Sequence, residues 1–130
     1  MNWLIFLFLV MISTSTPPKS PKDFVWKNRI LIVRQPDSEE FWMKENLTDL
    51  LLERKLLVFW FEGDRLIRSN YKGEIDAESF IRRLSAESSW ALIGLDGGTK
   101  SIGKSEPVLE EILKIIDSMP MRVRERNGNF

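Results

Sequence analysis

Asp37 and Ser38 lie between an apolar segment and an amphipathic one. They are the residues of this sequence best placed to do chemistry. A serine hydroxyl acts as a nucleophile when a neighbouring base takes its proton. The chain contains no histidine, so the base would be a lysine or a carboxylate such as Asp37. The structural alternative is helix capping, for which Ser and Asp are preferred residues. We favour capping, with Asp37 and Glu40 arranged as in a capping box.

Composition excludes thiol chemistry and the commonest metal sites. The 130 residues include neither cysteine nor histidine. The thiolate is the nucleophile of disulfide exchange, and Cys and His are the usual zinc ligands. Oxygen sites for Ca²⁺ or Mg²⁺ are left, but Glu39-Glu40 and Glu110-Glu111 do not form a recognisable calcium loop. We therefore expect no cofactor, no metal, and no thiol oxidoreductase or peroxidase activity.

Two further pairs of charged residues flank candidate turns. Asp96 and Lys100 stand on either side of a glycine pair, where they would form a polar site or stabilise the turn through Asp96. Asp117 and Arg122 bracket a Met-Pro-Met string. The two flexible thioethers would suit partner recognition, whereas the structural interpretation pairs Asp117 with Arg122 at the end of a helix. We favour the structural interpretation for both pairs.

A tryptophan beside the first pair indicates binding. Trp42 falls one position off the apolar stripe of its helix and close to Gln35-Pro36, so we expect its indole to be partly exposed. Exposed tryptophans are frequent among the residues that dominate protein interfaces. Together, Gln35, Asp37, Ser38 and Trp42 form one candidate surface for a protein or peptide partner.

The charge balance argues against a polyanionic partner. Lys plus Arg total 19 and Asp plus Glu total 19. Proteins that bind nucleic acid usually carry a basic stripe, and no such stripe is visible here. We expect no nucleic-acid partner.

Strands and helices alternate along the first half. The apolar runs at 29–34 and 56–61 are typical of strands buried on both faces. An apolar stripe between them predicts one helix over 37–55, and strand, helix and strand together predict a right-handed parallel unit. The Gly63-Asp64 pair either closes a hairpin with 65–68 or opens a loop. The stripe consists of Met43, Leu47, Leu50 and Leu51.

The second half continues with a helix that starts at Asp76, a strand at 90–95 and an antiparallel return at 99–103. The turn between these two strands is Asp-Gly-Gly, which supplies positive φ angles. A last helix is predicted from Ser105 to Pro120. Its expected buried face consists of Val108, Leu109, Ile112, Ile115 and Ile116.

The order β-α-β-α-β-β-α is that of an α/β thioredoxin-like fold, with three layers (α/β/α) and a central mixed sheet. Two helices would cover one face of the sheet and one helix the other. A ferredoxin-like arrangement is the alternative. Thioredoxin-like folds carry their functional site where the first strand meets the first helix. Here that junction is Gln35-Pro36-Asp37-Ser38.

Two strings in the C-terminal half resemble a family of uncharacterised thioredoxin-like, peroxiredoxin-like domains. They are Leu92–Lys100 (Leu-Ile-Gly-Leu-Asp-Gly-Gly-Thr-Lys) and Ile116–Arg122 (Ile-Asp-Ser-Met-Pro-Met-Arg). That family occurs alone in bacteria, usually behind a signal peptide, and in vertebrate secreted proteins with sushi repeats. The resemblance covers residues 24–126 and implies the architecture, with no settled activity. The family's Lys before the Asp is Leu95 here.

The N-terminus predicts export. Residues 3–12 form an unbroken apolar run, about half of the roughly 20 residues that a spanning helix needs. The run fits a secretory signal peptide over 1–16, and a buried N-terminal strand is the alternative. We expect a flexible leader at 17–23, the thioredoxin-like domain at 24–126 and a tail at 127–130. The protein would be periplasmic or secreted, with membrane contact only through an uncleaved signal segment.

These observations predict an exported, non-catalytic module that binds a protein or peptide partner. The alternative is an enzyme that uses carboxylate, lysine or serine chemistry at the first strand–helix junction. A third interpretation is a stabilising or matrix-associated domain without a small ligand. The candidate binding residues are Gln35, Asp37, Ser38, Trp42, Asp96, Lys100, Asp117 and Arg122.

Overall fold

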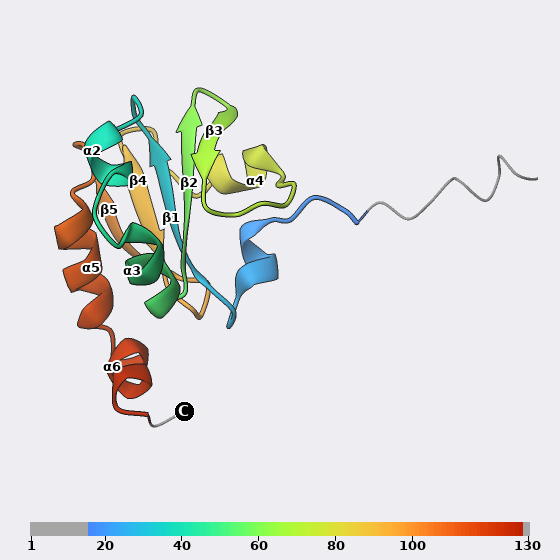
Figure 1. Ribbon diagram of the computed structural model, residues 1–130. Coiled ribbons are helices and arrows are strands. Elements are labelled where there is room, and N and C mark those ends of the chain that lie inside the picture. The colour runs from blue at the N-terminus through green and yellow to red at the C-terminus, as the bar shows by residue number, and fades with distance from the viewer. Residues whose placement is uncertain (1–15, 129–130) are drawn as a thin grey trace, which may run out of the picture.

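A five-stranded mixed sheet forms the centre of the computed structural model, which describes residues 16–128 (Figure 1). The segment predicted as a signal peptide lies outside the described residues, apart from Thr16. The strands are arranged in the order β3-β2-β1-β4-β5. Their bounds are β1 (Arg29–Arg34), β2 (Leu56–Glu62), β3 (Arg65–Ser69), β4 (Trp90–Ile93) and β5 (Thr99–Gly103).

The strand pairing confirms the predicted parallel unit. β1 and β2 run parallel, in register from Arg29 opposite Leu56 to Arg34 opposite Phe61. β4 lies antiparallel to β1, and β5 returns antiparallel to β4. The question left open at Gly63 is answered by a hairpin, because β3 pairs antiparallel with β2. Gly63 has a φ of +60°, which a glycine adopts without strain.

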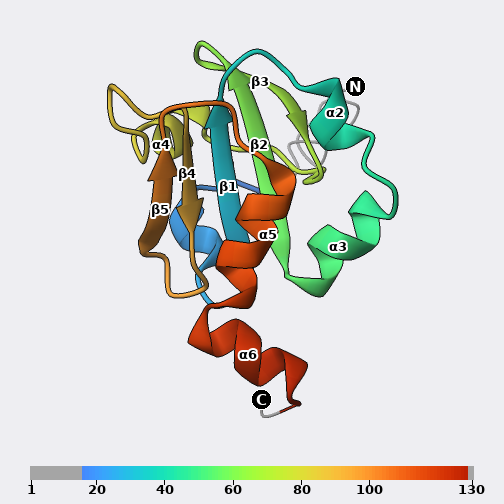
Figure 2. The same cartoon turned by 90° about the vertical axis from the view of Figure 1, so that its left-hand side faces the viewer.

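Helices cover both faces of the sheet, as Figures 1 and 2 show. α2 (Glu39–Trp42), α3 (Leu47–Glu53) and α5 (Leu109–Asp117) lie on one face. The short 3₁₀ helix η1 (Pro21–Phe24) and α4 (Ala77–Ile81) lie on the other. The apolar run of β1 therefore supplies Leu31 and Val33 to one core, and Ile30 and Ile32 to the other.

This arrangement is consistent with a thioredoxin-like α/β fold, and the ferredoxin-like alternative is not adopted. A further helix, α6 (Pro120–Arg126), follows α5. Pro120 therefore ends one helix and occupies the first turn of the next, where its missing N–H is not needed. Within residues 16–128, no helix has the length and apolar character needed to cross a membrane.

The prediction of one continuous helix over 37–55 is wrong. Two short helices, α2 and α3, form instead, with Asn46 between them in the left-handed conformation at a φ of +60°. Asn tolerates that conformation better than most residues, and a left-handed residue interrupts the helical hydrogen bonds. Leu51 is buried as predicted, but Met43 has left the apolar stripe and is 76% exposed.

Two predicted helix starts are also wrong. Ser38, not Asp37, caps α2, and its Oγ accepts the Phe41 N–H at 3.3 Å. The last helix begins at Leu109 rather than after Ser105. A start at Ser105 would place Glu106 in a helical conformation immediately before Pro107, which the proline ring disfavours. Val108 accordingly precedes the helix and is exposed.

Part of the segment predicted as a leader contacts the folded body. The Lys19 N–H donates to Glu74 O at 3.1 Å, and Lys19 O accepts the Asp76 N–H at 2.8 Å. Phe24 is buried, with its ring centroid 5.2 Å from that of Tyr71. Residues 19–24 therefore help to cover the face of the sheet that carries α4.

Candidate functional site

The eight candidate residues lie in two groups, one at each end of β1. The first group follows the C-terminal end of β1 and consists of Gln35, Asp37, Ser38 and Trp42. The second group lies near Arg29 at the N-terminal end and consists of Asp96, Lys100, Asp117 and Arg122. The two groups are therefore separated by the length of the strand.

A carboxylate and a guanidinium fix the Trp42 indole. Trp42 Nε1 donates to Asp37 Oδ1 at 2.9 Å, and Arg68 Nη1 lies 3.3 Å from Asp37 Oδ2. The Arg68 guanidinium carbon is also 4.7 Å from the centroid of the Trp42 ring, within the range of a cation–π contact. Trp42 is half-buried, as predicted from its helical position. Asp37 thus binds the side chains of Trp42 and Arg68, and Ser38 is the residue that caps α2.

The inner side of Trp42 packs on aromatic rings. Its ring centroid lies 5.4 Å from that of Phe41 and 6.0 Å from that of Trp60. Trp60 is fully buried, and its Nε1 donates to Gln35 O at 2.9 Å. The Gln35 side-chain amide donates to Ser89 Oγ. Gln35 therefore connects the end of β1 to Trp60 and Ser89, whereas Trp42 is the residue of this group whose ring is partly exposed.

A pocket of about 540 Å³ opens beside Trp42, between α3 and β3. Its lining includes Trp42, Leu47, Leu52, Arg68 and Asn70. We call this feature the Trp42 groove. It combines an aromatic ring, aliphatic side chains and polar groups on one surface.

The Asn70 side chain closes the sheet edge at this groove. Its Oδ1 accepts the Val58 N–H at 2.7 Å, and its Nδ2 donates to Leu56 O at 3.0 Å. These are backbone groups of β2 that lie beyond the end of β3. Asn70 therefore takes the place of a neighbouring strand, which is one way in which proteins protect an edge.

The side chains of Ser38 and Asp37 both take part in hydrogen bonds within the fold. A nucleophilic serine needs a base within hydrogen-bond reach. Ser38 Oγ instead accepts a backbone N–H of its own helix. In the described part of the chain, no hydrogen bond joins that oxygen to a carboxylate or lysine, and no three acidic residues are grouped to hold a metal ion.

In the second group, Asp96 and Lys100 stabilise the β4–β5 turn. Asp96 Oδ1 accepts the Gly98 N–H at 2.9 Å, and Lys100 Nζ lies 2.8 Å from Asp96 Oδ2. The hydrogen bond from Lys100, together with that from Gly98, lowers the pKa of Asp96 below its ordinary value. Lys100 also lies across Gly94, where a Cβ would be 2.6 Å from Lys100 Cε. Lys100 is therefore paired with Asp96 at this turn.

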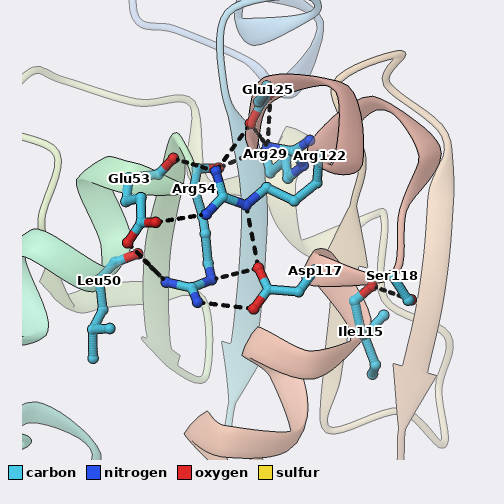
Figure 3. Close-up of polar contacts among 9 residues, drawn as sticks. All are labelled: Arg29, Leu50, Glu53, Arg54, Ile115, Asp117, Ser118, Arg122 and Glu125. Atoms are coloured by element: carbon cyan, nitrogen blue, oxygen red, sulfur yellow. Dashed lines mark hydrogen bonds and ion pairs between the residues drawn. The ribbon is translucent and has the colours of Figure 1, made fainter. Parts of the chain in front are cut away.

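Asp117 and Arg122 belong to an ion-pair network that joins α3, α5 and α6 (Figure 3). Arg54 binds Asp117 through two hydrogen bonds of 3.0 and 2.9 Å, and Arg122 Nε donates to Asp117 Oδ1 at 3.2 Å. Arg122 also donates to Glu53 Oε1 at 2.9 Å. Burial disfavours the Asp117 charge, but the bonds from the two guanidinium groups outweigh burial and lower the pKa of Asp117.

The same contacts act on Arg122, which is almost fully buried at 3% exposure. Burial lowers the pKa of its guanidinium, but hydrogen bonds to Asp117 and Glu53 outweigh burial and raise the pKa above its ordinary value. The local Asp117–Arg122 pair of the structural interpretation is therefore present. Arg122 holds the start of α6 against α3.

Arg29 was not among the predicted site residues. It is 1% exposed, although it is the first residue of β1. Its Nη1 donates to Arg54 O at 2.9 Å and to Glu125 Oε2 at 3.3 Å. Among the described residues, its Nε and Nη2 have no hydrogen-bond partner. The available sequence signal was its place at the start of the apolar run, where a charged residue bounds the strand.

The fold and these two groups of residues define a cysteine-free α/β module with a polar and aromatic surface after the C-terminal end of its first strand and a set of charged pairs near the N-terminal end. The chain belongs to the family described as a domain of unknown function (DUF4174), whose model matches residues 20–125. The match begins at the residue before η1 and includes both groups. No curated protein and no solved structure matches the chain.

Proposed function

We propose that this chain is an exported, non-catalytic module that binds a peptide segment of a partner protein in the Trp42 groove. One observation carries the proposal: a partly exposed indole is fixed between Asp37 and Arg68 beside a pocket of about 540 Å³. A side chain that is already fixed loses little conformational freedom when a partner binds. Trp and Arg are also the residue types that most often dominate binding energy at interfaces.

The lining of the groove suits a peptide with an apolar side chain. Leu52 is 71% exposed on α3, and Leu47 and Trp42 contribute further apolar surface. Arg68, which lies against the Trp42 ring, and Asn70 add polar groups to the lining. An apolar centre with polar groups around it is the usual composition of a protein interface.

The absence of catalysis is supported by residue types and by contacts. The chain has no histidine or cysteine, and the Ser38 hydroxyl and the Asp37 carboxylate both take part in structural hydrogen bonds. Export is supported by the apolar run at 3–12. An enzyme at this junction would need to release Ser38 or Asp37 from those bonds.

The test is quantitative capture of partners from envelope and culture-medium fractions. The bait is wild type, Trp42→Ala or Trp26→Ala. Trp26 is the matched control, because it is 63% exposed and lies before the opposite end of β1. We expect Trp42→Ala to recover about tenfold less partner, equivalent to about 1.4 kcal/mol, and Trp26→Ala to behave as wild type. Equal recovery by Trp42→Ala, with circular dichroism unchanged, would overturn the proposal.

A further inference from the structure

A second pocket, of about 240 Å³, lies at the other end of β1. It is bounded by the β4–β5 turn on one side and by the junction of α5 and α6 on the other. We call it the Arg29 pocket. Its lining includes Arg29, Leu95, Lys100, Met119, Pro120 and Met121. The Arg29 pocket shares no lining residue with the Trp42 groove, so a ligand here goes beyond the proposed function.

The donors of Arg29 point to the chemistry of that ligand. Nη1 is occupied by Arg54 O and Glu125, whereas Nε and Nη2 have no partner among the described residues. In a guanidinium group, the N–H bonds of Nε and of the adjacent Nη run parallel and match the two oxygens of a carboxylate. Buried donors without a partner are uncommon and need an explanation. From this we infer that the Arg29 pocket binds a small monocarboxylate with a short apolar chain, through Arg29 Nε and Nη2.

The surrounding charges select a single negative charge. Glu125 already lies 3.3 Å from Arg29 Nη1, and Asp96 lines the pocket with its own partner, Lys100. A dianion such as phosphate would be repelled by the carboxylates of Glu125 and Asp96, and only one edge of the Arg29 guanidinium would be available to bind it. A monocarboxylate needs only the Nε–Nη2 edge of Arg29.

The walls select a short apolar chain. Leu95 is buried, and Met119 and Met121 are half-buried, on either side of Pro120. The volume of about 240 Å³ is smaller than the roughly 300–1,000 Å³ of typical ligand pockets. A chain of a few methylene groups would contact these side chains and leave the carboxylate at Arg29.

A ligand can reach these donors only if side chains around the pocket move, and Met119 and Met121 are among the lining residues. Arg29 Nε and Nη2 are covered in this conformation. A methionine side chain is unbranched and turns readily, so Met119 and Met121 can move aside without a change in the backbone. The backbone between them is held by Pro120 and by the Asp117–Arg122 contact of 3.2 Å. The Met-Pro-Met string thus combines a fixed main chain with two mobile side chains.

The test uses the full chain with ¹³C-labelled methionine methyl groups and ¹⁵N-labelled arginine. Hexanoate is titrated beside hexanamide, which has the same chain without the charge, and inorganic phosphate, which is an anion without the chain. We expect saturable shifts of the Met119 and Met121 methyl signals and of the Arg29 Nε–H signal with hexanoate alone. Equal shifts with hexanamide, or shifts with phosphate at the same concentration, would overturn the carboxylate assignment.

Variants assign the effect to the pocket. Arg29→Met should weaken hexanoate binding at least about tenfold, the loss expected for a bidentate charged contact. Met121→Phe fills the pocket from a half-buried position, leaves Arg29 in place, and should give the same loss. Trp42→Ala should bind hexanoate as wild type does, which separates this inference from the proposed function. Unchanged binding by a folded Met121→Phe variant would contradict the inference.

Discussion

Trp42 Nε1 donates to Asp37 Oδ1 at 2.9 Å, so a carboxylate in the connection after β1 orients the indole of the last residue of α2. The other oxygen of Asp37 binds Arg68, which belongs to the edge strand β3. The contact therefore ties the short helix α2 to the edge of the sheet. α2 has only four residues and few hydrogen bonds of its own, so its position depends on such side-chain contacts.

Asp37→Asn separates the two contacts of this carboxylate. The amide oxygen still accepts the Trp42 N–H, but the charge that attracts Arg68 is lost. Because the Arg68–Asp37 pair is partly exposed, we expect a loss of less than about 1 kcal/mol in the free energy of unfolding. Asp37→Ala removes both contacts and should cost about 1 kcal/mol more. Urea titration followed by tryptophan fluorescence measures both; a larger loss in Asp37→Asn than in Asp37→Ala would contradict this division.

Asp117 should contribute to stability in a pH-dependent way. Its pKa is lowered in the folded protein from an ordinary value of 3.8. Its contribution is therefore complete above that value and is lost as pH falls through the folded pKa. We expect Asp117→Asn to be about 1–3 kcal/mol less stable than wild type at neutral pH, with the difference shrinking in acid. Urea unfolding at a series of pH values tests this.

The control for Asp117 is Glu78→Gln, which removes an exposed ion pair with Arg82 on α4. That pair is solvated on both sides, so its loss should hardly change the unfolding midpoint at any pH. A pH-independent difference for Asp117→Asn would show that shape, rather than charge, accounts for its effect.

Gly97→Ala should destabilise the β4–β5 turn by about 1–2 kcal/mol. Gly97 has a φ of +84°, and a Cβ there would lie 2.9 Å from Val25 Cγ2. Gly63→Ala is the matched control, because Gly63 has a φ of +60° with nothing within 4 Å of the added carbon. It carries the backbone strain without the clash. Thermal unfolding should rank Gly97→Ala below Gly63→Ala; the reverse order would contradict the role assigned to Val25.

Asn70→Ala should open the edge of β2. Val58 N–H and Leu56 O would lose their partner, and we expect a loss of about 1–2 kcal/mol in stability. Asn70→Asp keeps the acceptor for Val58 and removes the donor to Leu56, so it should fall between Asn70→Ala and wild type. Amide hydrogen exchange at Val58 reports this contact directly. Unchanged exchange at Val58 in Asn70→Ala would show that the edge is protected in another way.

The strands were predictable because their environment is uniform. Residues 30–33 of β1 and 56–61 of β2 are all apolar because helices cover both faces of the sheet, and such runs are easily recognised in a sequence. The β4–β5 turn was predictable for a local reason, because Asp-Gly-Gly supplies the positive φ that Gly97 adopts.

The break in the first helix was not predictable, because the apolar stripe continues in sequence through the left-handed Asn46. The burial of Arg29 was hidden for a different reason. A charged residue at the end of an apolar run is usually solvated, and the partner that buries it, Glu125, lies 96 residues away.

The candidate site was predicted in part. The half-buried position of Trp42 follows from helical spacing, and the Asp117–Arg122 pair follows from a separation of five residues. Arg68 was missed because it is 31 positions from Asp37 in the sequence, with α2, α3 and β2 between them. Contacts of this kind depend on which strands become neighbours in the sheet. A single sequence does not specify which side chains then come into contact.

The most direct test of the binding proposal is the indole N–H signal of Trp42 in ¹⁵N-labelled protein, recorded while a captured partner peptide is added. Binding in the Trp42 groove predicts that the Trp42 and Arg68 side-chain signals shift together and saturate, while the Trp26 indole signal stays in place. Saturable binding of the partner with the Trp42 and Arg68 signals unmoved would contradict the proposed function.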